Sequence, residues 1–407
     1  MVDTAPAAPD DPDSPRLRIA MIGTGFMARA HSHAWRTAPR FFDLPLRPEL
    51  AVIAGRDPAR TEAAAAKLGW SGHDRDWRRV IERDDIDLVD IVTPGDTHAE
   101  IAVAALEAGK HVLCEKPLAN TVADAQRMAR AAESAADRGQ LSFCGFSYRR
   151  TPALTLARRF VQEGRLGAVR HVRAQYLQDW LSDSASPMTW RLDRVRAGSG
   201  SLGDIGAHSI DTAQWLTGQR ITGVSGVLRT FVSRRPVLDQ QVGLGGTASA
   251  DAPLAEVTVD DAAAFTASFE DGALGVFEAT RMALGRRNAN RIEVNGEHGS
   301  IAFDFERMNE LEYYDGAAAD DEAEGFRRIQ VTDPAHPYAP NWWPTGHGLG
   351  YEHLFTHQAV DVVTAVAQGT SASPTFAEAL GVQKVLAAVA SSAADASRWT
   401  EIDEETR

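Results

Sequence analysis

Two side chains suited to acid–base chemistry, Asp204 and His208, stand four positions apart at the end of a glycine-rich run, 198–206. If a helix begins near Asp204, the two side chains lie on one face of it, one turn apart. An imidazole beside a carboxylate exchanges protons near neutral pH, which suits general acid–base catalysis. Each residue also has a structural interpretation, Asp204 as a helix cap and His208 as an ordinary core histidine. The pair therefore needs support from the rest of the chain.

A second chemical motif lies near the N-terminus, where an apolar run, 18–22, leads into Gly23-Thr24-Gly25-Phe26-Met27-Ala28 and then into a helical pattern. Gly23 permits a tight turn, Gly25 lets the backbone approach a pyrophosphate, and the small Ala28 lets helix and strand pack closely. In this context the motif predicts dinucleotide binding, with an ordinary glycine-rich turn as the alternative. The cofactor-binding candidates here are Gly23, Gly25, Phe26 and Met27.

The end of the next predicted strand, 50–54, bears on the choice of cofactor. NAD-selective sites usually carry an acid at this strand end, where it binds the ribose 2′-hydroxyl. Gly55 and Arg56 stand there instead, and Arg56 suits a 2′-phosphate, so the residue tilts the choice between NAD and NADP toward NADP. Arg56 could equally be a solvated surface charge, and Asp57 before Pro58 is typical of a helix N-cap.

Strand-like runs and helical patterns alternate up to residue 148, which predicts a parallel sheet with right-handed crossovers. Motifs that follow such strands lie on one rim, where open α/β sheets bind ligands. Two polar motifs fall there, Thr93-Pro94 with His98, and Glu115-Lys116-Pro117. The proline holds Lys116 extended at a strand end, where the amine could transfer a proton, although a surface lysine is the general expectation.

After Tyr148 the pattern changes to alternating strands and hairpin turns, such as the turn at Asp271-Gly272. This half predicts an antiparallel sheet with a few helices. The fold class is therefore α/β, with a Rossmann domain followed by an α+β domain. The expected segments are a disordered tail at 1–15, the first domain at 16–148, the second at 149–407, an extended polar loop at 235–257, and C-terminal helices at 351–369 and 376–397.

Composition narrows the class of protein. The chain of 407 residues exceeds one ordinary core, and its formal net charge of −14 argues against nucleic-acid or anionic-membrane partners. No apolar run approaches the ~20 residues of a membrane span, and the N-terminus has no secretory pattern, so we expect a cytoplasmic protein. Cys114 and Cys144 indicate no disulfide framework. His31 and His33 lack a third ligand at a telling spacing, so no metal site is predicted.

Together and in this order, the motifs make the chain resemble the Gfo/Idh/MocA oxidoreductases over nearly its whole length after residue 16. The marks are Gly23-x-Gly25-x-x-Ala28, Thr93-Pro94 with His98, Glu115-Lys116-Pro117, and Asp204-x-x-x-His208 after the glycine run. Within the family, the strings 148–152, 177–180 and 190–191 are similar to levoglucosan dehydrogenase-like sugar dehydrogenases, with inositol dehydrogenases the next relatives. Two departures concern the cofactor, since Gly95 replaces a common Asn and Gly55-Arg56 replaces the NAD-type acid.

The resemblance implies a Rossmann domain, a second domain with a large open, mainly antiparallel sheet, and homo-dimers or homo-tetramers formed through that sheet. It also implies a site between the domains, in which Lys116, Asp204 and His208 surround the substrate and the nicotinamide of NAD(P). His208 would take the alcohol proton, and Lys116 would stabilise the developing alkoxide. Asp204 would position His208 or bind a neighbouring hydroxyl of the substrate. The further cofactor contacts would be Arg56, Thr93, Pro94, His98, Glu115 and Lys116.

The substrate that we expect is a neutral sugar, anhydrosugar or cyclic polyol, oxidised at a secondary alcohol. Trp180 and Trp190 suit the apolar face of a pyranoside, while Asp179 and Arg191 suit its hydroxyls. Ordinary packing explains these four residues equally well. Two other functions stay open, a trans-dihydrodiol dehydrogenase-like activity and a non-catalytic regulator that senses a dinucleotide.

Overall fold

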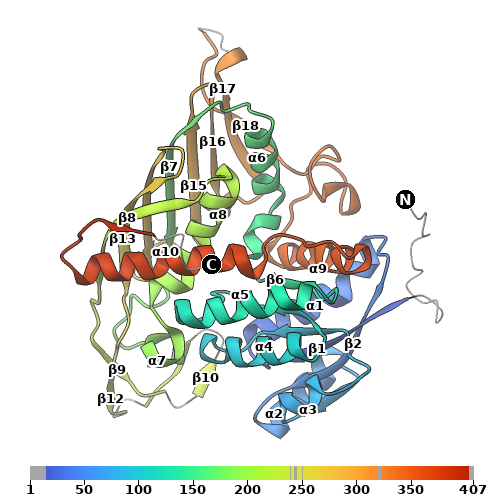
Figure 1. Cartoon of the computed structure of the whole chain (residues 1–407). Helices are drawn as coiled ribbons and strands as arrows, with labels where there is room; N and C mark the ends of the chain where they lie inside the picture. The colour runs from blue at the N-terminus through green and yellow to red at the C-terminus, as the bar shows by residue number, and fades with distance from the viewer. Residues whose placement is uncertain (1–14, 239, 243–244, 250, 319–321, 403–407) are drawn as a thin grey trace. The chain divides into compact units, whose positions relative to one another are not determined.

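The computed structural model describes residues 15–238, 240–242, 245–249, 251–318 and 322–402 (Figure 1). These residues form two compact units. Unit 1 comprises residues 1–147 and 350–380, and unit 2 comprises residues 148–349 and 381–407. The tail expected at 1–15 lies outside the described residues except for Pro15.

Unit 1 is built on a six-stranded sheet in the order β3-β2-β1-β4-β5-β6, in which every neighbouring pair is parallel. This is the doubly wound arrangement that the alternating sequence pattern predicts. The strands are β1 (Arg16–Ile22), β2 (Arg47–Ala54), β3 (Gly72–Asp74), β4 (Leu88–Ile91), β5 (His111–Cys114) and β6 (Ser142–Cys144). The helices are α1 (Phe26–Phe41), α2 (Pro58–Leu68), α3 (Trp77–Ile81), α4 (His98–Glu107) and α5 (Val122–Ala136).

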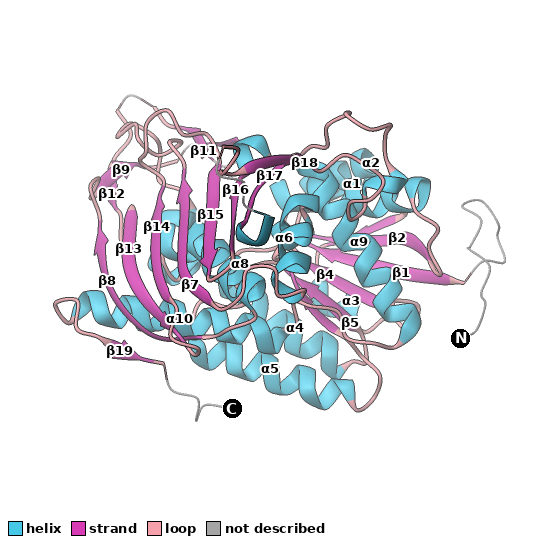
Figure 2. Ribbon diagram, turned by 90° about the horizontal axis from the view of Figure 1, so that it is seen from above, coloured by secondary structure: helices cyan, strands magenta, loops and turns pink. Residues whose placement is uncertain are grey.

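One helix of unit 1 comes from far along the chain. Helix α9 (Tyr351–Gln368) places Phe355, Ala359 and Val362 in the same buried cluster as Trp35 of α1, and Figure 2 shows α9 alongside α1. Because these three residues recur at helical spacing, they form one apolar face that α1 covers. The structure thus differs from the expected boundaries, which assign residues 350–380 to the second domain.

Unit 2 contains a nine-stranded sheet in the order β18-β17-β16-β15-β7-β14-β13-β8-β19. Its neighbours are antiparallel except for the parallel pair β7 and β14, which confirms a large, mainly antiparallel sheet. The strands are β7 (Val169–Leu177), β8 (Ile221–Arg229), β13 (Ala262–Phe269), β14 (Leu274–Thr280), β15 (Ala289–Gly296), β16 (Gly299–Asp304), β17 (Glu310–Asp315), β18 (Arg327–Gln330) and β19 (Thr400–Glu401).

Helices α6 (Pro152–Gln162) and α8 (Ala207–Thr217) pack on one face of the sheet, through β16 and β17 for α6 and β7 and β15 for α8. Helix α10 (Phe376–Ala394) adjoins β8, where Gly226 N donates to Ser392 Oγ at 3.0 Å. Residues on the helix-covered face alternate with exposed ones along each strand, as in β13 and β14.

The polar stretch 235–257, expected as an extended loop, contains short strands. β9 (Arg234–Pro236) pairs with β12 (Leu254–Glu256), and β10 (Gln240–Val242) pairs with β11 (Gly245–Thr247). In the pair of β9 and β12, Leu254 is exposed and the one buried side chain is that of Arg235, so the pair shows little of the apolar alternation that marks a strand in a sequence. In the part of the chain described here, no helix is both long and apolar enough to cross a membrane.

The glycine run is shaped by a close backbone approach. It follows the short helix α7 (Arg194–Ala197), and a Cβ at Gly200 would overlap the backbone of Asp260. Gly200 N donates to Asp260 Oδ1 at 2.7 Å, and Leu202 N donates to Asp260 Oδ2 at 2.8 Å. Only glycine fits at position 200 without moving this backbone.

Gly200→Ala is expected to lower the free energy of unfolding by at least ~1–3 kcal/mol, because the backbone of Asp260 cannot yield as a flexible side chain does. Gly381→Ala is the matched control. A Cβ there meets no atom within 4 Å, and alanine in the helix α10 should stabilise it by up to ~1 kcal/mol. Denaturant unfolding of both variants measures the difference, and equal stability of the two would refute the close approach.

Candidate active site

The glycine turn of unit 1 has the geometry of a pyrophosphate cradle. Gly23 follows β1 with φ of 119°, and its N–H donates to Ala54 O at 2.8 Å. Gly25 is the N-cap of α1, no side chain caps this helix end, and a Cβ at Gly25 would meet nothing within 4 Å. The helix N-terminus therefore faces room for an anion, as dinucleotide binding requires. Ala28, fully buried, lets α1 approach the sheet.

The end of β2 is too crowded for the acid of an NAD-type site. A Cβ at Gly55 would lie 2.6 Å from Thr61 Oγ1 and 2.8 Å from Thr24 Cγ2. The next side chain, Arg56, is exposed. Asp57 caps α2 by accepting from Arg60 N at 3.1 Å, which confirms its interpretation as a helix N-cap.

Two strand-end motifs of unit 1 are tied together by His98. Its Nε2 lies 2.9 Å from Thr93 O and its Nδ1 lies 3.1 Å from Pro117 O, and the side chain is buried. The histidine thus joins the turn after β4 to the turn after β5. The sequence predicts a cofactor contact for His98. In the structure, its two ring nitrogens lie against backbone carbonyls of these two turns.

Gly95 lies against the side chain of Asn120, a residue that the sequence analysis did not single out. A Cβ at Gly95 would lie 2.5 Å from Asn120 Oδ1, so a larger residue there would require this carboxamide to shift. The only local signal for Asn120 is its place four residues after Lys116.

Lys116 follows β5 and is half-buried. Its backbone N donates to Glu115 Oε2 at 3.3 Å, and its peptide bond to Pro117 is cis. Glu115 itself is buried and points at His31, whose Nε2 lies 3.1 Å from Glu115 Oε1. Glu115 therefore supports the turn from inside the unit.

In unit 2, a π-helical turn (Leu202–Gly206) continues directly into α8, so Asp204 and His208 lie on one continuous helical segment. Wide turns of this kind are frequent at functional sites. The buried pair of Arg149 and Asp211 fixes α8, because Arg149 Nη2 and Nε donate to Asp211 at 2.6 and 2.9 Å.

Asp204 faces a guanidinium that sequence reasoning missed. Arg281 follows β14, is fully buried, and places Nη1 3.4 Å from Asp204 Oδ2. Its Nη2 also donates to Asp260 O at 3.3 Å. In the sequence, this contact is indicated only by an arginine that follows a strand-like run.

His208 packs against two tyrosine rings. The ring of Tyr148 lies edge-on at 4.6 Å between centroids, and that of Tyr176 lies at 5.9 Å. The two tyrosine rings are themselves 5.9 Å apart, so the three rings form a triangular cluster. The two tyrosine hydroxyls are 2.6 Å apart, and Tyr176 OH donates to Asn288 Oδ1 at 2.7 Å. This cluster restricts the orientation of the imidazole, which a proton-transfer group requires.

Trp180, one of the residues expected to contact the sugar, is connected to these tyrosines through hydrogen bonds. Trp180 Nε1 donates to Gln178 Oε1 at 3.0 Å, and Gln178 Nε2 donates to Asn288 Oδ1 at 2.8 Å. The guanidinium of Arg281 lies 5.7 Å from the Trp180 ring centre. One hydrogen-bonded chain therefore links Trp180 to the rings around the imidazole.

The other expected sugar contacts, Trp190, Arg191 and Asp179, have different surroundings. Arg191 lies over the Trp190 ring at 4.4 Å, and burial lowers the pKa of its guanidinium, with Asp204 acting in the opposite direction. Asp179, by contrast, accepts from Gly285 N at 3.2 Å and pairs with Arg287 at 3.2 Å. Its carboxylate holds the loop after β14, a role that the sequence did not suggest.

Comparisons with known proteins agree with this architecture. Residues 17–143 match the oxidoreductase family with an NAD-binding Rossmann fold, and residues 154–302 match the GFO/IDH/MocA C-terminal domain. The chain is 41% identical to levoglucosan dehydrogenase of Pseudarthrobacter phenanthrenivorans over 95% of its own length and 98% of the relative's.

Two solved structures extend the likeness. An oxidoreductase domain protein from Kribbella flavida shares 59% identity over 96% of this chain and all of the other, with a TM-score of 0.91. A levoglucosan dehydrogenase in complex with NADH and levoglucosan shares 39% identity over 96% of this chain and all of the other, with a TM-score of 0.89. With both of its halves matched in one order, the chain belongs to the Gfo/Idh/MocA family of NAD-binding oxidoreductases.

Proposed function

We propose that the protein is an NAD(P)-dependent dehydrogenase that oxidises a secondary alcohol of a sugar, anhydrosugar or cyclic polyol. The observation that carries the proposal is the helical pair of unit 2, in which Asp204 faces Arg281 and His208 packs against Tyr148 and Tyr176. The relatives named above include a levoglucosan dehydrogenase, and a myo-inositol 2-dehydrogenase from Thermotoga maritima is 27% identical over 71% of the chain.

Each residue has one task in this reaction. His208 accepts the alcohol proton, and Lys116 donates a hydrogen bond to the same oxygen while negative charge develops on it. Asp204, held by Arg281, orients the imidazole and balances its charge. When it is bound along the Gly23–Met27 turn, an oxidised nicotinamide dinucleotide supplies the hydride acceptor. A regulator without catalysis would not need this acid–base set.

Lys116→Ala and His208→Asn should each lower kcat by about two to four decades, because a positioned proton-transfer group or oxyanion donor contributes that much. Steady-state kinetics, NADH binding by fluorescence and thermal unfolding separate chemistry from folding. The controls are Lys67→Ala on α2 and His298→Ala, both exposed. Turnover near that of the wild type in Lys116→Ala or His208→Asn would remove that residue from the mechanism.

The substrate class is tested by a steady-state panel of levoglucosan, glucose, myo-inositol, their deoxy and phosphorylated analogues, and an aromatic dihydrodiol. The rings of Trp180 and Trp190 suit an apolar sugar face, and the polar groups of Gln178 and Arg191 suit hydroxyls. A deoxy analogue should lose ~10²-fold or more in kcat/KM, because it leaves a buried partner unpaired. Preference for the dihydrodiol or a sugar phosphate would overturn the assignment.

For the cofactor we propose that Arg56 admits NADP alongside NAD, because Gly55 leaves no place for the acid that would exclude a 2′-phosphate. Two relatives of known structure are described as complexes with NADH, which supports use of the unphosphorylated form as well. The exposed guanidinium would bind the phosphate through a charge-assisted contact.

Arg56→Ala should raise KM for NADP⁺ by about ten- to a hundredfold, the loss of one charge-assisted hydrogen bond, while KM for NAD⁺ changes much less. Arg60→Ala, an exposed arginine in the first turn of α2, is the control. If the wild type uses only NAD⁺ and Arg56→Ala behaves as the wild type does, Arg56 is a surface charge.

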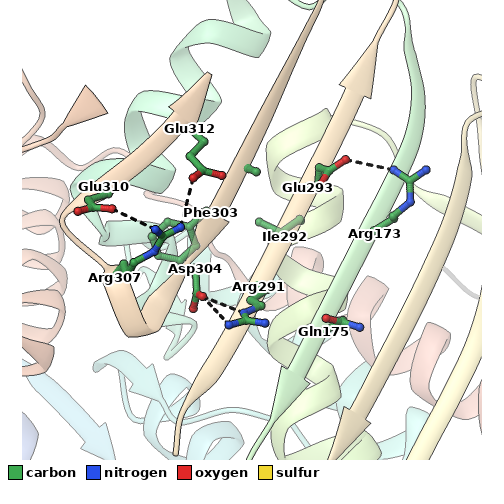
Figure 3. Close-up of a pocket in the computed structure, with 11 residues that line it drawn as sticks. Arg173, Gln175, Arg291, Ile292, Glu293, Phe303, Asp304, Arg307, Glu310 and Glu312 are labelled. Atoms are coloured by element: carbon green, nitrogen blue, oxygen red, sulfur yellow. Dashed lines mark hydrogen bonds and ion pairs between the residues drawn. The ribbon is translucent and has the colours of Figure 1, made fainter. Parts of the chain in front are cut away.

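We propose that the open face of the nine-stranded sheet joins copies of the chain. This face carries a shallow hollow, in which the pairs Arg173–Glu293, Arg291–Asp304 and Arg307–Glu312 lie across neighbouring strands (Figure 3). Farther along the same face, Val276 and Leu274 of β14 are 46% and 47% exposed. A face that mixes paired charges with exposed apolar side chains suits a second copy of itself.

Val276→Lys should shift the wild-type dimer or tetramer toward monomer, because the ammonium would be buried unpaired at the contact. Glu62→Lys on α2, also exposed, introduces the same side chain elsewhere and serves as control. Sedimentation velocity reads the assembly state. A monomeric wild type, or an assembly that Val276→Lys leaves intact, contradicts the proposal.

The cytoplasmic location stays a prediction.

A further inference from the structure

Unit 1 contains a buried ionisable cluster that the proposed chemistry does not use. His31 of α1 lies between Asp90 of β4 and Glu115, the residue after β5. Its Nδ1 is 3.0 Å from both oxygens of Asp90, and its Nε2 is 3.1 Å from Glu115 Oε1. Trp35 Nε1 also donates to Asp90 Oδ2 at 2.8 Å. The His31 side chain is 2% exposed, and those of Asp90 and Glu115 are 0% and 6% exposed.

The two nitrogens of His31 require two protons. A neutral imidazole has one N–H and one lone pair, so one of its nitrogens would face a carboxylate without a hydrogen. The doubly protonated ring instead donates to both carboxylates, and this gives each buried charge a partner. Burial acts to lower the pKa of His31, but Asp90 and then Glu115 outweigh it and raise the pKa to about 10.

Helix α9 packs an uncharged ring against the imidazole, that of Phe355, at 5.5 Å between centroids. Beside the two carboxylates, Cys114 at the end of β5 has a thiol whose pKa burial raises. Because the folded pKa of His31 lies above its ordinary value near 6.5, the ion pairs stabilise unit 1 fully below that pH and lose their effect as the pH rises through about 10.

Glu115 transmits this anchoring to Lys116. One carboxylate oxygen of Glu115 faces His31, and the other accepts from the backbone N of Lys116 at 3.3 Å. The Glu115 backbone N donates to Ile91 O at 2.9 Å, and a Cβ at Gly145 would lie 2.6 Å from Glu115 Oε1. The Glu115 carboxylate therefore lies against Gly145 and contacts both the His31 ring and the Lys116 backbone.

We propose that His31 is a positioning residue, which bridges Asp90 and Glu115 through both ring nitrogens and thereby fixes the turn that carries Lys116. The effect on turnover rests on the proposed function of Lys116. The ionisation of His31 and the position of the Lys116 backbone do not, so they can be tested without any substrate.

The first test is NMR of protein labelled with ¹⁵N-histidine. Long-range ¹H–¹⁵N correlations should show both ring nitrogens of His31 protonated at pH 8, where a histidine of ordinary pKa is neutral. The variant His31→Gln assigns the signal by its loss. His33, exposed on the same helix, is the internal reference for a histidine that faces solvent. A single protonated nitrogen on His31 at pH 8 overturns the proposal.

The second test compares His31→Gln with His33→Gln. In His31→Gln the backbone amide signal of Lys116 should shift, and kcat should fall by about ten- to a hundredfold with the sugar KM within about threefold, because a misplaced catalytic group slows chemistry more than binding. His33→Gln should match the wild type in both respects. An unmoved Lys116 amide in a folded His31→Gln variant contradicts the proposal, even if no sugar proves to be a substrate.

A pH profile separates positioning from general destabilisation. Without the imidazolium, one of the two buried carboxylates holds a proton, and kcat of His31→Gln should decline as rising pH removes it. In the wild type, this cluster should cause no decline of kcat below about pH 9. Adding Asp90→Asn to His31→Gln removes one charge and should restore the flat profile. A double variant that keeps the decline would show that the cluster does not act through its charge.

Discussion

The candidate acid–base pair depends on one buried carboxylate. Asp260 accepts hydrogen bonds from groups of residues 200–202 at 2.7 to 2.8 Å and so anchors the start of the helical segment that carries Asp204 and His208. The backbone oxygen of Asp260 accepts from Arg281, the guanidinium that faces Asp204. Asp260 therefore holds both the segment of Asp204 and the guanidinium of Arg281 in place. The pair needs no reorganisation when charge develops during a reaction.

Much of unit 1 could be predicted because its signals are local. The glycine turn after β1, the caps of α2 and the motifs after β4 and β5 each occupy a few consecutive residues, and parallel strands bring their ends to one rim by geometry alone. The segment of α9 could not be assigned in this way. Its apolar face identifies a helix, but the residues that it packs against lie more than 300 positions earlier, and no short pattern specifies them.

The site residues that sequence reasoning missed are defined by contacts distant in sequence. Asp204 and Arg281 are 77 residues apart, and Tyr148 and Tyr176 contact His208 from two different elements. Such pairs carry no mutual spacing signal. Asp179 shows the converse, because a residue type suited to binding hydroxyls instead accepts bonds from the loop after β14. Composition suggests which groups are available, and only the fold decides which of them face a ligand.

The central claim is that the protein moves a hydride from a secondary alcohol carbon of a neutral cyclic sugar to a nicotinamide dinucleotide. The direct measurement is to incubate the enzyme with NAD⁺ or NADP⁺ and levoglucosan deuterated at its alcohol carbons, and to determine the mass and C4 proton spectrum of the reduced cofactor. The reduced cofactor should carry one deuterium at C4, and turnover should be slower with the deuterated sugar if hydride transfer limits the rate. A reduced cofactor without deuterium, or no reduction with any neutral sugar or polyol, would contradict it.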